Sequence, residues 1–482
     1  NGANYYRSIM YPSATDIEWE ELGNYTDRLH MAQEMDDIIE LSKNRGMFVH
    51  FNMQIHFSFE YHWNAYHKNW CWNSTRQGVP FCYNTLVNSP DPIDFFTNTE
   101  AKNYYKQRLR YILARWGYST AIAVLEMFSE INAVDVFQEE NQNDTTHYDL
   151  SNNWQVTRNW QVEMADYIKR HYNGKIHLLT ASYAGPKNKS DDLFTNQNID
   201  IITSNIYDLK EPSYSSFWSN NVSKEFLNEG DPSKNCYTLL NEKPMLFSES
   251  DPLVDINCDY NVVEVQRAMW QSMFSGLAGS LSWDVRKSPH VFPIFGQMRN
   301  FISQFDLEEE RWHPGASELY DYADQRTWRH VERFADNMDG EVKPKDGGGK
   351  RERRADIAYL RSGDQNFVIG VITNKSYNIY TVDNCLDEYW DYYAQPSMHP
   401  DSLWQPPITP ASSVNCENEK LKLRGLHNSK YYINYFSINN LKSPVFSSDD
   451  NGPRVKIEYT VQSNLNGYII LFMARRKNFN WM

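Results

Sequence analysis

Residues 121–132, AIAVLEMFSEIN, are the most informative stretch of the sequence. Five apolar residues are followed by Glu126, and Glu130 comes four residues later. A continuous apolar run bounded by polar residues is typical of a strand buried on both faces, as in a parallel sheet. Residues 244–250, PMLFSES, repeat the arrangement and place Glu249 at the same end. We therefore predict two buried strands that each carry a carboxylate into one two-carboxylate site.

The region around these stretches alternates between predicted strands and predicted helices, which indicates an α/β fold. The seven predicted strands cover residues 4–10, 47–57, 121–130, 176–183, 199–207, 244–250 and 279–284. We predict a (β/α)8 TIM barrel, and we expect its missing first βα unit to lie upstream of residue 1. An open doubly wound sheet is the competing architecture, but no G-x-G-x-x-G follows any of these strands.

The composition changes after residue 340. Residues 341–354 form a Gly-rich basic linker, and residues 355–482 contain short β-rich runs separated by Asn, Gly, Asp and Ser. Such spacing is typical of a β-sandwich. We predict three parts: a barrel over 1–340, the linker over 341–354 and an all-β sandwich over 355–482.

Charge and hydropathy exclude several classes of partner. The net charge of −15 over 482 residues argues against a nucleic acid or an anionic membrane. No apolar run reaches the roughly 20 residues of a membrane-spanning helix. Aromatic residues make up 15% of the chain, which suits a cleft for a neutral ligand as well as core packing. No standard metal-ligand spacing and no phosphate-binding loop occurs, so we expect neither a metal nor a cofactor.

The cysteines indicate the compartment. The chain has six cysteines and no C-x-x-C pair, and sequential pairing would keep each bridge local. The predicted bridges are Cys71–Cys82, Cys236–Cys258 and Cys385–Cys416. Three such disulfides would indicate an extracellular or cell-surface protein, and six N-x-[ST] sequons are available for glycosylation. Buried free thiols in a cytosolic enzyme are the alternative.

Two side chains on polar strand faces are candidates for substrate contact. In residues 47–57, His50, Asn52, Gln54 and His56 share one parity while apolar residues occupy the other. Asn205 has the same type of position on a later strand. We expect His56 and Asn205 either to reach a substrate or to be satisfied polar groups of the interior.

With these motifs in place, residues 1–300 resemble the clan A glycoside hydrolases, especially the family 5 cellulase and mannanase group. That group carries a W-E-x-x-N-E type segment with its acid/base residue, which residues 125–130 match at Glu130. Its nucleophile follows a proline and a hydrophobic run, which matches Glu249. The resemblance also implies substrate-site roles for Arg7, Tyr207 and Trp283.

The roles implied by the resemblance are specific. Two carboxyls about 5–5.5 Å apart across a glycosidic bond carry out the retaining mechanism, one as acid and the other as nucleophile. Arg7 and Tyr207 would hold the Glu249 carboxylate, and Trp283 would form the floor of the sugar subsite. Ser129 stands where the family has an Asn that contacts the substrate. Glu126 is a rival acid, although its position within a strand favours a buried ion pair.

We therefore expect a secreted retaining glycoside hydrolase that cleaves β-linked polysaccharide or oligosaccharide of the mannan or glucan type. A catalytically impaired glycan-binding or structural surface protein on the same scaffold is one alternative. A transglycosylase that uses the same two glutamates is another. The sequence leaves the sugar, endo or exo action and the oligomeric state open.

Overall fold

The computed structural model describes residues in two compact units. The parallel-sheet unit comprises Asn4–Ile206 and Leu239–Ser248, and the second unit comprises Asn1–Ala3, Tyr207–Thr238 and Glu249–Met482. The described residues are 2–134 without 13, 60–71, 73–74, 77–78 and 90; 150–206 without 173–176 and 184–190; and 243–250, 265–266, 269–270, 272–274, 278–282, 291–305, 312–314, 355–362, 366–374, 416–423, 430–437, 446–451, 455–461 and 469–477.

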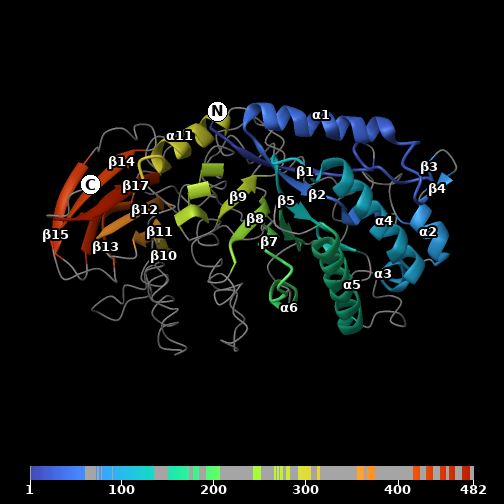
Figure 1. Cartoon of the computed structure of the whole chain (residues 1–482). Helices are drawn as coiled ribbons and strands as arrows, with labels where there is room; N and C mark the ends of the chain where they lie inside the picture. Colours follow the sequence, from blue (N-terminus) through green and yellow to red (C-terminus); the bar gives the residue numbers. More distant parts are fainter. Residues whose placement is uncertain are drawn as a thin grey trace, which may run out of the picture. The chain divides into compact units, whose positions relative to one another are not determined.

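A parallel sheet forms the centre of the first unit (Figure 1). Its order is β1-β2-β5-β6, the same as the order along the chain. The strands are β1 (Tyr5–Ile9), β2 (Phe48–Asn52), β5 (Ile122–Glu126) and β6 (Leu178–Thr180). A doubly wound sheet would reverse direction at a switch point, and these four strands do not.

The sequential progression continues beyond β6. The backbone N–H of Asn205, in β7 (Ile202–Ile206), donates to the Tyr183 carbonyl at 2.9 Å. The Ile202 N–H donates to the carbonyl of Pro244 at 2.9 Å, directly before β8 (Met245–Ser250). Each new strand is thus added beside the one that precedes it in the chain.

The helices pack on one face of the sheet, and polar side chains occupy the other. On the helical face, Tyr6 donates or accepts a 2.6 Å hydrogen bond with Ser42 of α1 (Leu29–Arg45), and Phe51 packs edge-to-face on Trp116 of α4 (Thr99–Trp116). On the opposite face lie Tyr5, Arg7, His50 and Glu126. The predicted parity of β2 is confirmed, and both of its faces are buried.

Local signals explain the helix ends. Gly46 follows α1 in the left-handed conformation, with φ of 63°, and its N–H bonds to the Lys43 carbonyl, as expected for a glycine after a helix. Asn98 caps α4 by accepting a hydrogen bond from the Ala101 N–H at 3.0 Å. The remaining elements of this unit are η1 (His56–Phe59), β3 (Thr75–Arg76), β4 (Val79–Pro80), α2 (Cys82–Val87), α3 (Ile93–Thr97), η2 (Ile131–Ala133), α5 (Leu150–His171) and α6 (Asp191–Phe194).

Two predicted strands are shorter than expected. The strand predicted over 47–57 ends at Asn52, and η1 follows from His56. The strand predicted over 121–130 ends at Glu126, so Glu130 lies beyond it. In both places the chain leaves regular pairing just where the polar side chains gather.

The second unit contains two antiparallel sheets. A six-stranded sheet has the order β10-β11-β12-β17-β14-β15, and β13 pairs with β16. The elements are β9 (Gly279–Ser282), α11 (Phe292–Ile302), β10 (Trp312–Pro314), β11 (Ala355–Ser362), β12 (Phe367–Asn374), β13 (Cys416–Leu423), β14 (Lys430–Ser437), β15 (Phe446–Asn451), β16 (Val455–Val461) and β17 (Ile469–Arg476). Strands β10 and β15 were not predicted from the sequence, and the predicted linker over 341–354 lies outside the described residues.

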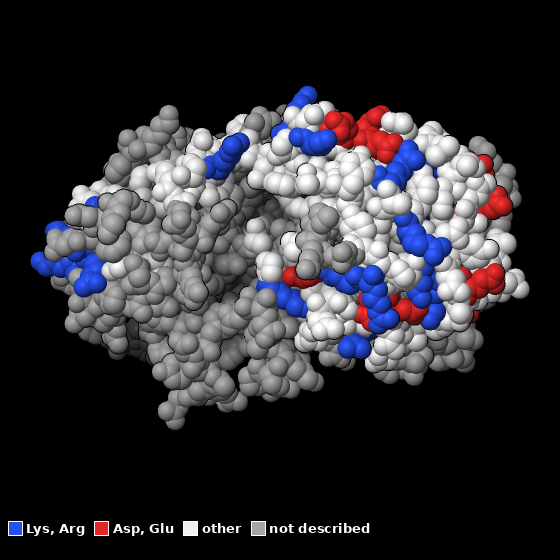
Figure 2. Space-filling model, viewed as in Figure 1, with Lys and Arg blue, Asp and Glu red and all other residues white. Residues whose placement is uncertain are grey.

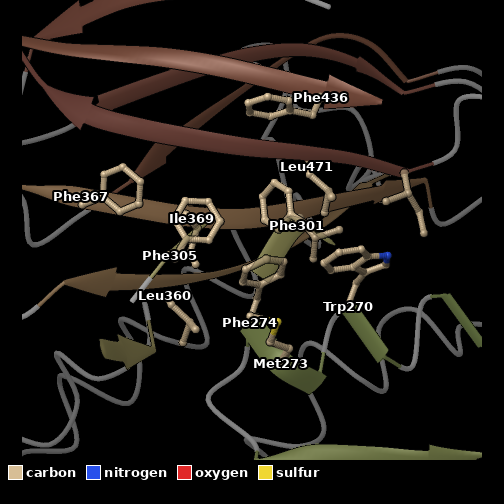
Figure 3. Packing of buried hydrophobic residues seen from close by; sticks show 12 residues of the cluster. Trp270, Met273, Phe274, Phe301, Phe305, Leu360, Phe367, Ile369, Phe436 and Leu471 are labelled. Atoms are coloured by element: carbon tan, nitrogen blue, oxygen red, sulfur yellow. The ribbon is translucent and has the colours of Figure 1, made fainter. Parts of the chain in front are cut away.

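One hydrophobic core joins helical residues before 305 to the six-stranded sheet (Figure 3). Trp270, Phe274 and Phe301 pack in the same cluster as Phe367 and Leu471. Trp270 and Phe274 are stacked with an interplanar angle of 8°, and Phe301 meets Phe436 edge-on. Residues on both sides of the predicted domain boundary at residue 340 thus share one core.

The face seen in Figure 2 carries basic and acidic side chains close to each other. Among the described residues, Lys102 and Lys106 both donate to Glu163, at 2.9 and 2.5 Å. None of the helices in the described part of the chain is long and apolar enough to cross a membrane.

Candidate active site

Glu126, the last residue of β5, belongs to a buried ion pair. Arg7 of β1 donates from Nε to Oε2 at 2.7 Å and from Nη2 to Oε1 at 2.8 Å. This two-pronged geometry is the strongest form of Arg–carboxylate contact. His50 Nε2 lies 2.9 Å from Oε2 of the same carboxylate, and its Nδ1 is 3.0 Å from the Tyr5 hydroxyl. The predicted buried ion-pair role of Glu126 is confirmed.

The charge states of this pair follow from its surroundings. Burial alone raises the pKa of Glu126, but Arg7 and His50 outweigh it and hold the pKa at about 2. Burial also lowers the pKa of His50, which favours the neutral ring. Because a carboxylate only accepts hydrogen bonds, neutral His50 carries its proton on Nε2. Glu126 is therefore an anion with every oxygen engaged.

Glu130 has an unusual backbone for a residue with a side chain. Its φ of 51° and ψ of 50° lie in the left-handed region. The Glu130 N–H donates to the Ser182 hydroxyl at 3.2 Å, and the Glu130 carbonyl accepts from the Ala133 N–H at 2.8 Å. Such strain persists only where the surrounding structure imposes it, and it often marks a functional position.

The Glu130 carboxyl is held by a second polar network. Asn205 of β7 donates from Nδ2 to Glu130 Oε1 at 2.8 Å, and Ser248 of β8 donates from its hydroxyl to Asn205 Oδ1 at 2.6 Å. His56 Nδ1 lies 3.5 Å from Glu130 Oε2. Burial raises the pKa of Glu130, as does the nearby Glu126 anion, against the opposing effects of Asn205 and Arg7. The carboxyl thus tends to keep its proton, which suits a general acid.

Arg7 also contacts the residue that precedes Glu130. Its Nη2 also donates to the Ser129 hydroxyl at 2.7 Å, and Ser129 is buried next to Glu130. The serine that stands in place of the family's Asn therefore serves as a partner for Arg7. The substrate contacts of Arg7, Ser129, His56 and Asn205, and the pairing of Arg7 with Glu249, stay predictions.

The other predicted site residues are only partly described. Glu249 lies in β8 and is 6% exposed, and it is assigned to the second unit. Tyr207 and Trp283 lie outside the described residues. Trp72, between η1 and β3, is fully buried and donates from Nε1 to the Ser89 carbonyl at 3.0 Å, so it is a packing residue.

The predicted disulfides are not shown. Cys82 is a free, buried thiol, and burial raises its pKa well above the ordinary value. Cys71, Cys236, Cys258 and Cys385 lie outside the described residues, and Cys416 lies in β13.

Two members of the site, Ser182 and Ser248, were not predicted from the sequence. Ser182 holds the Glu130 backbone and Ser248 holds Asn205, and both are at most 1% exposed. Ser248 precedes Glu249 directly in the chain, which was the one available signal for it. Serine is too common in strands for that position alone to identify it.

Comparisons with known proteins give the following. No protein-family model and no curated protein matches the chain. A glucosidase from Croceicoccus marinus is 12% identical, with 98% of this chain and 90% of that chain covered and a TM-score of 0.40. A putative glycoside hydrolase from Bacteroides vulgatus is 8% identical, with 98% and 73% covered and a TM-score of 0.44. A family 5 mannosidase from Rhizomucor miehei is 13% identical, with 58% and 72% covered and a TM-score of 0.37. TM-scores at this level do not assign a family.

Proposed function

We propose that this protein is a glycoside hydrolase in which Glu130 is the general acid. The supporting observation is the contrast between two neighbouring carboxyls. The pKa of Glu130 is raised, with burial as the main cause, whereas Arg7 and His50 hold that of Glu126 at about 2. When their environments separate the pKa values of two titratable groups, one group can act as an acid while the other is an anion at the same pH.

Glu126 does not suit either catalytic role. It is fully buried, and Arg7 engages both of its oxygens. An attacking carboxylate needs an accessible oxygen, and an acid needs a proton. Glu130 keeps some exposure and lies where the chain leaves β5, at the carboxyl end of a parallel strand, which is the usual place for catalytic residues in this class of fold.

The finer form of the proposal is a retaining hydrolase of β-linked mannan-like or glucan-like substrates, with Glu249 as nucleophile. Glu130 would protonate the leaving oxygen while Glu249 attacks the anomeric carbon, and Glu130 would then activate water. The scaffold would be a (β/α)8 barrel followed by a β-sandwich, outside the cell, with the two bridges that do not involve Cys82, Cys236–Cys258 and Cys385–Cys416. Sequential parallel strands with α1 and α4 on one face support the barrel.

Azide rescue tests the assignment. With 2,4-dinitrophenyl β-glucosides and β-mannosides, we expect azide to restore turnover of Glu130→Ala with a β-glycosyl azide product. For Glu249→Gly we expect an α-glycosyl azide. Glu40→Gln, a change at a 60% exposed side chain, is the matched control and should behave like the wild type.

The alternatives give different outcomes. A wild type that binds β-glycans but hydrolyses neither them nor the aryl glycosides, without rescue in either variant, would overturn the hydrolase proposal in favour of a glycan-binding protein. Transfer products at high acceptor concentration would instead indicate a transglycosylase.

A further inference from the structure

Asn205 is fully buried, which favours the second of its two predicted roles, a satisfied polar group of the interior. Its amide has a hydrogen-bond partner at each end, Glu130 at Nδ2 and Ser248 at Oδ1. A side chain without exposed surface acts on a bound molecule only through its neighbours. The neighbour that carries chemistry here is Glu130.

We propose that Asn205, with its amide held by Ser248, is a positioning residue that places the transferable proton of Glu130 on Oε2. This inference rests on the proposed role of Glu130 as general acid. It assigns a role to two strands, β7 and β8, that contribute no atom to the proton transfer itself.

Ser248 fixes the orientation of the Asn205 amide. The Ser248 hydroxyl can donate, and the only amide atom that accepts is Oδ1, at 2.6 Å. With Oδ1 turned towards Ser248, the amide directs Nδ2 at Glu130. Ser248 is 1% exposed, so water does not compete readily for this contact.

The two carboxyl oxygens of Glu130 have different neighbours. Oε1 accepts the Asn205 N–H at 2.8 Å, and a donor on Oε1 disfavours a proton there. The proton of the neutral acid therefore belongs on Oε2, the oxygen that lies 3.5 Å from His56 Nδ1. In the proposed reaction the Oε2–H bond breaks and the proton moves to the glycosidic oxygen. That oxygen takes the electron pair of the breaking C–O bond.

Asn205 also changes the acidity of Glu130. An N–H donor stabilises the carboxylate more than the acid, so Asn205 lowers the pKa of Glu130 against the raising effect of burial. Arg7 acts in the same direction and Glu126 in the opposite one, and His56 faces Oε2. Without the Asn205 side chain, the Glu130 carboxyl should keep its proton to higher pH, but the proton should no longer be restricted to Oε2.

Leaving-group dependence separates positioning from a general structural role. Phenyl glycosides need the acid, whereas 2,4-dinitrophenyl glycosides leave without protonation. For Asn205→Leu we expect kcat/KM to fall about 10- to 100-fold on phenyl glycosides and less than about twofold on dinitrophenyl glycosides, since proton transfer contributes roughly 10²–10⁴. The basic limb of the pH profile should move to higher pH. Ser248→Ala should show the same pattern more weakly.

Thr203→Val is the matched control. Thr203 is a fully buried polar residue of the same strand, and its hydroxyl contacts Thr180 and the Ala181 carbonyl. Any loss it causes should be equal on the two substrates. Equal losses for Asn205→Leu, with an unmoved basic limb, would overturn the positioning role.

Two comparisons with Glu130→Ala distinguish a failure of the positioning role from a failure of the proposed function. If Glu130→Ala retains the wild-type leaving-group dependence, Glu130 is not the acid and the proposed function fails. If Glu130→Ala selectively loses activity on phenyl glycosides and Asn205→Leu does not, only the positioning role fails.

A measurement without substrate tests the same contact. The destabilisation caused by Asn205→Leu in denaturant unfolding should grow between pH 4 and pH 8 in the wild-type background. It should be independent of pH in the Glu130→Gln background. An identical pH-independent effect in both backgrounds would show that the amide does not act on the Glu130 carboxylate, and the proposal would fall even for an inactive protein.

Discussion

Arg7 and Glu126 form a buried pair in which each partner depends on the other. Loss of Arg7 leaves a buried carboxylate without a counter-charge. We expect Arg7→Met to destabilise the fold by about 3–5 kcal/mol at neutral pH, measured by urea unfolding. The pKa of Glu126 lies near 2 in the folded state, below its ordinary value of 4.5, so the pair's contribution is present above pH 4.5 and is lost as the pH falls towards 2.

The double change Arg7→Met with Glu126→Leu is the control for this prediction. It removes both charges, and we expect it to recover much of the lost stability. A single variant as stable as the wild type at pH 7 would show that the pair is not needed.

The backbone of Glu130 leads to a second prediction. At φ of 51° a glycine has no steric penalty, whereas alanine does. We expect Glu130→Gly to be more stable than Glu130→Ala by about 1 kcal/mol, which reverses the usual order. Denaturant midpoints of the two variants provide the measurement, and equal midpoints would argue against a left-handed backbone at this residue.

The raised pKa of Glu130 predicts a dependence of stability on pH. A carboxyl whose pKa is raised, here chiefly by burial, stabilises the fold fully below its unfolded value, and this contribution is lost as the pH rises through the folded value. Glu130→Gln removes the titration and keeps an acceptor for Asn205. We expect this variant to match the wild type near pH 4 and to exceed its melting temperature at pH 7. A constant difference across this range would contradict the assignment.

At the scale of elements, Gly46 ends α1 in a conformation that other residues adopt with strain. Its φ is 63°, and no atom lies within 4 Å of the position that a Cβ would occupy. The whole effect of a substitution therefore comes from the backbone. We expect Gly46→Ala to lower the free energy of unfolding by about 1 kcal/mol, and Gly46→Asn to lower it less, as measured in urea. Equal and negligible losses would contradict this reading.

The strands were the part of the structure that the sequence predicted best. The apolar run before Glu126 and the alternation in β2 correctly indicated buried strands, because periodicity reports which faces are covered. Their ends were wrong by several residues. Periodicity does not reveal that Glu130 adopts a left-handed conformation, since the hydroxyl that accepts its N–H belongs to Ser182, 52 residues later.

The candidate site was less predictable than the strands. Both glutamates of the opening stretch were identified, and the buried role of Glu126 followed from its position in a strand. Their hydrogen-bonded pairings were not predicted, because Arg7 and Glu126 are 119 residues apart in the sequence and Asn205 and Ser248 are 43 residues apart. Such contacts depend on the order of strands in the sheet, which local patterns do not specify.

At the scale of the whole molecule, the core around Trp270 and Phe301 sets a limit on where the chain can be divided. These residues share one cluster with strands β12 and β17. We expect a chain truncated after residue 340 to aggregate or to lose cooperative unfolding, because this apolar surface would be uncovered. Solubility and thermal melts of residues 1–340 against the full chain provide the measurement.

A milder change tests the same core. Phe436→Ala should cost about 3–5 kcal/mol in the full chain. A soluble, cooperatively melting 1–340 fragment would contradict the dependence on the six-stranded sheet.

The sequential order of β1, β2, β5 and β6 bears on how the chain is made as well as on where its residues lie. During synthesis each of these strands leaves the ribosome after the neighbour it pairs with. The growing sheet can extend at one edge without waiting for later residues, which keeps the sequence separation of its contacts low for a parallel architecture. Glu126 thus meets Arg7 and His50 early, whereas Asn205 lies 75 residues after Glu130 in the chain and its own partner Ser248 follows 43 residues later.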